Sequence, residues 1–318
     1  MSLSGIERGQ GWRTLPNTLS GDIPAVVRYL ALDQARNAYR LLGSGSVIGL
    51  IDGRWLVTAT AAALFEGAAL GAPAPAASSG LDRRYPFEAL RNLRCALTVR
   101  ERSGEILCPL AGAVISATIS QRDTALVFVG LPEALPVSVL PIDLGPPPGA
   151  AQTILVAGFA AAAAVHPHAG DGNELPAVPA RHLLVREGFF GDFGATTGRL
   201  HYPLFRHLIP LEPTMMGGPV ILQREVEPGQ AVRTLAAINS QDVPQVSGDP
   251  GARPEREGEG FATHALALYS QEVLLPSGTW IPFLEAVRRG VVSSYGVQAL
   301  RVAQRAGEPG LTQYYIEP

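Results

Sequence analysis

The side chains that can act in acid–base or nucleophilic chemistry are distributed unevenly along this chain. All 25 residues counted as lysine or arginine are arginine, which excludes Schiff-base chemistry, a P-loop lysine and a Ser-Lys dyad. The six histidines all lie in the second half, so the first half contains none of the residues that most often act as general base. They are His166, His168, His182, His201, His207 and His264.

One group of these residues consists of side-chain types that can bind a metal ion. His166 and His168 are followed by Asp171, in a stretch that reads as a loop and has Pro167 between the two histidines. Two or three ligands on a loop do not define a coordination geometry. We therefore expect no metal site and no other cofactor.

The two cysteines, Cys95 and Cys108, are too few for a disulfide framework or a cysteine-based zinc site. They flank a predicted hairpin, whose register is set if Ser103-Gly104 is a two-residue turn. In that register Cys108 faces Val99 rather than Cys95. We therefore predict two free, buried thiols.

The composition limits the class of protein. The 318 residues include 35 glycines and 27 prolines, which indicates many turns and argues against a helical bundle. The net charge of −3 provides no positive field for nucleic acid, so we expect no nucleic-acid partner. The first residues lack the apolar segment of a signal peptide, and no apolar run is long enough to span a membrane. We expect a soluble, cytoplasmic protein.

Most of the elements that would position a site are predicted to be short β-strands. Apolar runs at Ser46–Ile51 and Trp55–Ala59 surround an Asp52-Gly53 turn, and further short runs follow at 8–15-residue spacing. The segment from Asp22 to Gly43 fits either a helix or two strands joined by a turn at Gln34–Asn37. The pattern as a whole predicts two β-barrels, or a sandwich and a barrel.

Two helices are predicted near the C-terminal end. Residues Ser277–Arg289 read as a helix with Ser277 or Thr279 as N-cap and two arginines at its end. A second helix is predicted over Val297–Ala306.

Three segments, in order along the chain, resemble the trypsin-like serine protease family. Gly43–Ala62 is similar to the family's Gly-Ser-Gly strand and the following strand that ends in Leu-Thr-Ala-Ala-His. Arg122–Val129 is similar to the Asp-Ile-Ala-Leu strand that carries the triad aspartate. Thr214–Leu222 is similar to Gly-Asp-Ser-Gly-Gly-Pro. Supporting similarities are Val156–Ala160, Leu235–Ser240 and Trp280–Val287.

The resemblance implies an all-β fold. It predicts two antiparallel six-stranded β-barrels, a C-terminal helix, and irregular extensions at both ends. The corresponding divisions are an N-terminal arm at 1–21, a first barrel at 22–135, a Pro-rich linker at 136–152, a second barrel with the C-terminal helix at 153–290, and a C-terminal extension at 291–318.

The departures from the family bear directly on catalysis. Ala61 stands at the family's histidine position, Met216 at its nucleophilic serine, and Thr214 at the first glycine of the serine motif, while Asp123 keeps the acid. A methyl group accepts no proton and a thioether forms no acyl intermediate, so the triad is incomplete. Asp123 is then expected to hold local structure by accepting backbone N–H groups. We expect His201 and His207 to be ordinary histidines.

The sequence therefore predicts a pseudoprotease that binds another protein or serves as a scaffold or regulatory subunit. Its partner would occupy the vestigial cleft by strand addition, or contact the terminal extensions. The alternative is an active hydrolase with a relocated nucleophile, such as Ser240 or Ser46, and an unconventional base. The predicted cleft residues are Thr214, Met215, Met216, Gly217, Gly218, Asn239, Ser240 and Gln241.

Overall fold

The computed structural model describes most of the chain. Within the described residues, no helix has the length and apolar character needed to cross a membrane. The described residues are 11–15, 25–35, 37–66, 82–98, 105–116, 123–145, 148–149, 152–160, 174–175, 183–194, 204–240, 260–295, 301–306 and 312–317.

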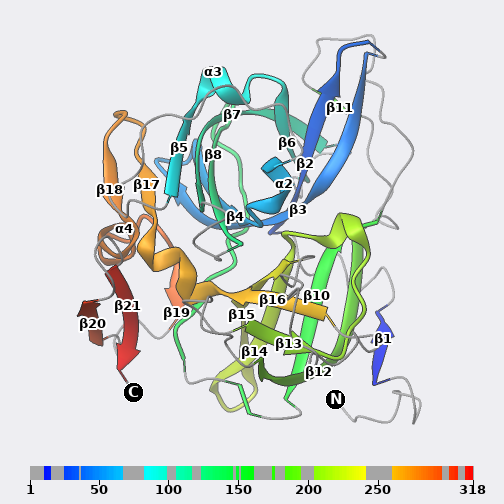
Figure 1. Cartoon of the computed structure of the whole chain (residues 1–318), viewed down its shortest axis with the longest axis vertical. Helices are drawn as coiled ribbons and strands as arrows, with labels where there is room; N and C mark the ends of the chain where they lie inside the picture. Colours follow the sequence, from blue (N-terminus) through cyan, green and yellow to red (C-terminus); the bar gives the residue numbers. More distant parts are fainter. Residues whose placement is uncertain are drawn as a thin grey trace, which may run out of the picture.

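The first half of the chain forms a closed six-stranded antiparallel barrel, which we call barrel 1 (Figure 1). Its strands pair in the order β2-β3-β4-β8-β7-β6, and β6 pairs with β2 to close the ring. The segment from Asp22 to Gly43 therefore contributes strands rather than a helix, and Asn37 takes a positive φ of 45° in the turn between them. The strands are β2 (Val26–Asp33), β3 (Ala38–Ile51), β4 (Trp55–Thr60), β6 (Leu93–Thr98), β7 (Glu105–Ser116) and β8 (Ala125–Gly130).

The second half forms another closed antiparallel barrel, barrel 2. Its strands pair in the order β10-β12-β13-β16-β15-β14, and β14 pairs with β10. Numbered along the chain, both barrels have the ring order 1-2-3-6-5-4, so the same topology is built twice. The prediction of two six-stranded barrels is confirmed. The strands are β10 (Thr153–Phe159), β12 (Leu183–Gly194), β13 (Leu204–His207), β14 (Pro219–Glu227), β15 (Gln230–Ser240) and β16 (Gly260–His264).

Shorter elements join the barrels at their edges. β1 adds to β12, while β5 and β11 each add to β7. Helix α2 follows β4, α3 follows β5, and the 3-10 helices η3 and η4 precede β14 and follow β16. Their bounds are β1 (Trp12–Thr14), α2 (Ala63–Glu66), β5 (Asp82–Pro86), α3 (Phe87–Leu90), β11 (Glu174–Leu175), η3 (Pro213–Met215) and η4 (Ala265–Ser270).

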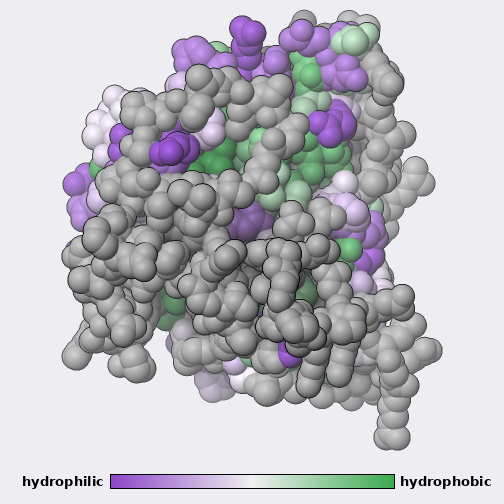
Figure 2. Space-filling view, in the orientation of Figure 1, coloured by the Kyte–Doolittle hydropathy of each residue, from purple (hydrophilic) through white to green (hydrophobic). Residues whose placement is uncertain are grey.

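Each barrel encloses apolar side chains, because every strand of a closed barrel turns one face inward. On the face seen in Figure 2, the described side chains along the rim of barrel 1 are mostly hydrophilic, and hydrophobic ones lie inside that rim. Among the described residues, the large hydrophobic side chains that are exposed are Phe87 and Leu208. The apolar surface of the described strands is therefore largely used in the two cores.

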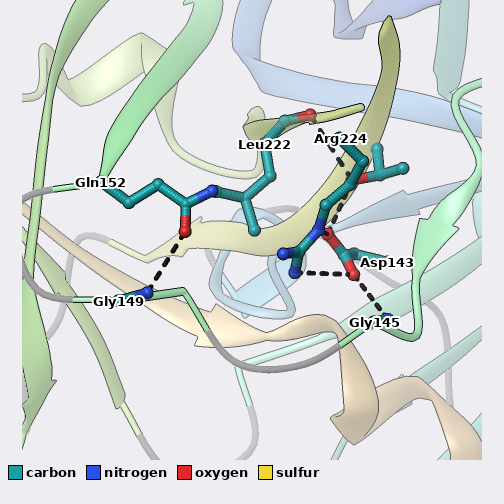
Figure 3. A network of polar contacts seen from close by, with 7 residues as sticks. Asp143, Gly145, Gly149, Gln152, Leu222 and Arg224 are labelled. Carbon is teal, nitrogen blue, oxygen red and sulfur yellow. Dashed lines mark hydrogen bonds and ion pairs between the residues drawn. The ribbon is translucent and has the colours of Figure 1, made fainter. Parts of the chain in front are cut away.

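The connection between the barrels is fixed by a buried carboxylate (Figure 3). Strand β9 (Ile142–Asp143) runs parallel to β15 and to β19 (Ser294–Tyr295). Asp143 Oδ2 accepts hydrogen bonds from Arg224 Nε at 2.8 Å and Thr234 Oγ1 at 2.7 Å. Its Oδ1 accepts from the N–H of Gly145 at 2.7 Å and from Arg224 Nη2 at 3.1 Å. Four hydrogen bonds compensate for burying this charge.

The C-terminal elements differ from two of the helix predictions. The helix predicted over Ser277–Arg289 begins only at Phe283, with Pro282 as its N-cap, so Ser277 and Thr279 are not its caps. The residues before it belong to a hairpin in which Val273 lies opposite Ile281, and cross-strand packing there favours strand over helix. The elements are β17 (Glu272–Leu274), β18 (Trp280–Pro282) and α4 (Phe283–Arg288).

The helix predicted over Val297–Ala306 is also wrong where the structure describes it. Arg301–Ala306 is strand β20, which pairs with β21 (Thr312–Glu317). The register places Val302 opposite Ile316 and Ala303 opposite Tyr315. The helix prediction failed because the sequence periodicity of one segment does not reveal the strand with which it pairs.

Candidate functional site

Asp123, the acid at the triad position, connects the two barrels. Its Oδ1 accepts the N–H of Ala63, the first residue of α2, at 2.8 Å, and its Oδ2 accepts the Ser240 hydroxyl at the end of β15. Asp123 lies just before β8 of barrel 1, whereas Ser240 belongs to barrel 2. The expected acceptance of a backbone N–H is therefore present, and the donor is the helix after β4.

Ala61, which the resemblance aligns with the family's histidine, is fully buried. The hydroxyls near it are committed to other partners. Thr60 Oγ1 donates to the carbonyl of Ser44 at 2.6 Å, and Thr58 Oγ1 donates to the carbonyl of Val127 at 2.9 Å. Neither threonine replaces an imidazole, because a hydroxyl of ordinary pKa is not a base at neutral pH.

The turn around Met216, the residue that the resemblance aligns with the nucleophilic serine, is closed by hydrogen bonds within the turn itself. The Met216 N–H donates to the Pro213 carbonyl at 3.3 Å, and the Gly218 N–H donates to the Met215 carbonyl at 3.0 Å. In trypsin-like serine proteases, the oxyanion hole consists of the main-chain N–H of the nucleophilic serine and that of the residue two positions earlier. Those groups correspond here to Met216 and Thr214. One of the two donors is thus used inside η3.

Ser44 of β3 holds this turn against barrel 1. Its N–H donates to the Met216 carbonyl at 2.9 Å, and its Oγ donates to the Thr214 carbonyl at 2.9 Å. The same Oγ accepts the N–H of Phe159, in β10, at 2.8 Å. Gly217 has a positive φ of 80°, which favours glycine at this point of the turn. Ser44 was not among the predicted site residues, although the Gly-Ser-Gly motif marked its strand.

The two methionines occupy different environments. Met215 is fully buried in the core of barrel 2, where a Cβ at Gly158 would come within 2.8 Å of the Met215 Cα. Met216 is partly buried and packs against the larger core cluster, which includes side chains of both barrels. The sequence left two interpretations for these methionines, core or cleft plug on the one hand and a partner site on the other. For Met215 the burial agrees with the core interpretation and excludes a place on a partner-binding surface.

The predicted edge for strand addition is already paired at Asn239. The Asn239 N–H donates to the Gly218 carbonyl at 2.9 Å, and the Asn239 carbonyl accepts the Gly217 N–H at 2.8 Å. The Asn239 side chain is buried and contacts His207 Nε2 through Oδ1 at 3.3 Å. An added strand cannot use these main-chain groups, which corrects the expected role of Asn239. Gln241 lies outside the described residues.

Of the described histidines, His207 is fully buried in barrel 2 and His264, at the end of β16, is partly buried. Burial lowers the pKa of His207 to about 4, against the opposing effects of Asn239 and the Ile209 backbone. Burial also lowers the pKa of His264 to about 4, although the charge of Asp143 acts in the opposite direction. His264 Nδ1 accepts the N–H of Leu266 at 3.1 Å. Both imidazoles are therefore neutral at pH 7 and serve local structure.

The metal and relocated-serine alternatives gain no support in the described part of the chain. No group of three His, Cys, Asp or Glu residues there could hold a metal ion. Ser46 is buried, and its hydroxyl lacks a hydrogen-bond partner. The remaining predicted candidates, His166, His168, Asp171, His182 and His201, lie outside the described residues.

Comparison with solved structures finds proteases at low identity. The crystal structure of the Rv3671c protease in an inactive form is 14% identical, with 78% of this chain and 86% of that chain covered and a TM-score of 0.39. The crystal structure of the serine endoprotease from Yersinia pestis is 15% identical, with 79% of this chain and 62% of that chain covered and a TM-score of 0.41. No family model and no curated protein matches the chain. The double-barrel fold follows from the strand pairing.

Proposed function

We propose that this chain is a catalytically inactive homologue of trypsin-like proteases that acts by binding protein, as a scaffold or regulatory subunit. The observation that carries the first half of the proposal is the hydrogen bond from the Met216 N–H to the Pro213 carbonyl. This bond removes an oxyanion donor at the same position where the nucleophile is absent. Together with Ala61, it leaves the site without base, nucleophile and one of the two donors.

The three losses affect separate parts of acyl transfer. Without an imidazole nothing takes the proton of an attacking hydroxyl, and without serine no acyl-enzyme forms. With one of the two N–H donors lost, the tetrahedral oxyanion is poorly stabilised, which alone costs about 10²–10³ in rate. Restoring any one part therefore leaves the other two missing.

The relocated-nucleophile alternative would use Ser240. Its hydroxyl donates to Asp123, it is 3% exposed, and the nearby Asn239 main chain is paired with the nucleophile turn. A substrate carbonyl would have to reach a hydroxyl that is buried and committed to a carboxylate. These contacts favour a structural role for Ser240.

The experiment for inactivity is covalent labelling of the full chain with a fluorophosphonate probe. We expect no labelling, while an active trypsin-like protease in the same mixture labels fully. Labelling of this chain at any serine, located by peptide mapping, would overturn the proposed inactivity. A Ser240→Ala variant would then identify whether that residue is the nucleophile.

The terminal extension is the better-supported contact element for a protein partner. Within the described residues, β20 and β21 pair only with each other, which leaves one edge of each strand for a partner strand. At Asn239, by contrast, the main chain is already paired. We expect a partner recovered by cross-linking in the native host to be lost on removing residues 301–317 and retained in Met216→Ala. The reverse pattern would place the partner in the cleft.

A further inference from the structure

The two cysteines lie opposite each other in barrel 1. In the ladder between β6 and β7, Cys95 is the register partner of Cys108, and Thr98 is the partner of Glu105. The expectation that Cys108 faces Val99 is therefore wrong, because the strands are joined by a longer connection than a two-residue turn. The difference of four residues is even, so each side chain keeps the face that the pattern predicts.

The register gives the two cysteines a Cα separation that a disulfide can span. Directly opposed residues of an antiparallel pair have Cα atoms about 4.5–5.5 Å apart, and a disulfide spans about 4.4–6.8 Å between Cα atoms. Both side chains are fully buried in the same core cluster. Both thiols are free in this structure. The sequence argument against a disulfide depended on the register, and that argument no longer holds.

We propose that Cys95 and Cys108 are a reversible redox pair that forms a cross-strand disulfide within barrel 1. The oxidant is a low-molecular-weight disulfide of the glutathione class. One cysteine thiolate attacks the oxidant, breaking its S–S bond and releasing one small thiolate. The second cysteine thiolate attacks the resulting mixed disulfide and releases the other. Two protein thiols are oxidised by two electrons, the oxidant is reduced to two thiols, and these take up the two protons.

The environment decides when this exchange occurs. Burial raises the pKa of Cys108 to about 12, and burial together with the neighbouring Cys108 and Glu105 raises that of Cys95. Because the thiolate is the attacking species, exchange in the closed barrel is slow. It proceeds during folding, before the barrel closes, or when the end of the β6–β7 ladder opens. Once formed, the bond is shielded from reductant by the same burial.

The disulfide would fix a part of barrel 1 where several strands meet. β7 pairs with β6, β8, β5 and β11, and β11 joins it at Glu105 and Ile106. A bond at Cys108 ties β6 to this shared strand two residues from Ile106, where that junction ends. The oxidation state of the pair would therefore set how readily the β6–β7 end of the barrel opens.

The test is refolding of the full chain in buffers with increasing ratios of oxidised to reduced glutathione. Iodoacetamide is then added in denaturant, and adducts are counted by mass spectrometry. We expect two adducts per chain in reducing buffer and none at high ratios, with a tryptic peptide pair linked through Cys95 and Cys108. Cys95→Ala and Cys108→Ala are the controls, and each should keep a single thiol that takes one alkyl group or one glutathione.

Two outcomes would overturn the proposal. One is recovery of both alkyl adducts at every ratio. The other is accumulation of mixed glutathione disulfides without the linked peptide pair, which would show that the cysteines cannot close the bond. Neither outcome depends on whether the alanine variants fold, because the decisive measurement is made on the unchanged chain.

Discussion

The N–H of Met216 donates to the carbonyl of Pro213 at 3.3 Å, across the single turn of η3. The bond directs this N–H at a main-chain carbonyl within the turn. The turn itself is clamped from barrel 1 by Ser44, which binds the carbonyls of Thr214 and Met216. Under the proposed function, this bond adds a main-chain component to the inactivity expected from Ala61 and Met216.

The first prediction concerns restoration of the triad. We expect the double variant Ala61→His/Met216→Ser to react with a fluorophosphonate probe at least about 100-fold more slowly than a triple variant that also carries Thr214→Gly. Glycine restores backbone freedom to the turn, so that the N–H at position 216 can leave Pro213. The rate of labelling at residue 216 is the measurement. Equal labelling of the two variants would show that the turn does not limit the chemistry.

The second prediction compares two buried serines of β3. Ser44→Ala should lower the free energy of unfolding by about 2–3 kcal/mol, because the Thr214 carbonyl and the Phe159 N–H each lose a partner. Ser46→Ala is the matched control, because the buried Ser46 hydroxyl has no partner in the described structure. Urea unfolding of both variants is the measurement. If Ser46→Ala lowered the free energy of unfolding as much as Ser44→Ala does, the role of Ser44 in holding the turn would be contradicted.

The third prediction concerns the carboxylate in the inter-barrel connection. Asp143→Ala should destabilise the chain by about 3–5 kcal/mol, since it leaves Arg224 and Thr234 without their acceptor in a buried site. Glu285→Ala is the control, because it removes only an exposed ion pair with Arg289, worth about 0.5 kcal/mol or less. Denaturant midpoints of the two variants would be compared. Similar midpoints would indicate that Asp143 does not hold the connection.

The fourth prediction concerns pH. Burial lowers the pKa of His207 and His264 from 6.5 to about 4. Between these values the unfolded chain binds more protons than the folded chain, so stability is present above pH 6.5 and is lost as the pH falls toward 4. Each histidine should contribute a loss of roughly 2 kcal/mol between about pH 7 and pH 5.

The matching variant for this pH effect is His207→Gln. It should lose less stability than the unchanged chain over the same pH interval, because one of the two described imidazoles with a lowered pKa is gone. Unfolding in urea at the two pH values provides the comparison. An identical loss in the variant and in the unchanged chain would show that His207 is not protonated on unfolding.

The strand arrangement could be predicted from the sequence where turn residues and buried runs coincide. The Asp52-Gly53 turn between β3 and β4 is an example, since Asp52 and Gly53 both take positive φ values there. The register of β6 against β7 could not be predicted, because no turn signal marks their connection with comparable strength. The start of α4 was missed because pairing between Val273 and Ile281 overrides local helix preference.

For the candidate site, the order of the motifs led to Ala61, Asp123 and Met216, and their assignment to triad positions stays a prediction. The hydrogen bond from the Ala63 N–H to Asp123 agrees with the structural role expected of that carboxylate. The role of Ser44 was not predictable, because its partners Phe159 and Thr214 lie 115 and 170 residues away in sequence. Nor does a residue pattern reveal that the Met216 N–H turns toward Pro213, since this depends on main-chain conformation.

Closure of both barrels also limits aggregation. A strand inside a closed ring has its main-chain groups paired on both sides, so it offers no template on which a second molecule can polymerise. In the described part of the chain, free strand edges remain on short additions to the rings and on the β17–β18 and β20–β21 hairpins. Among the described strands, edge-to-edge association with a second molecule could therefore begin only at those peripheral segments.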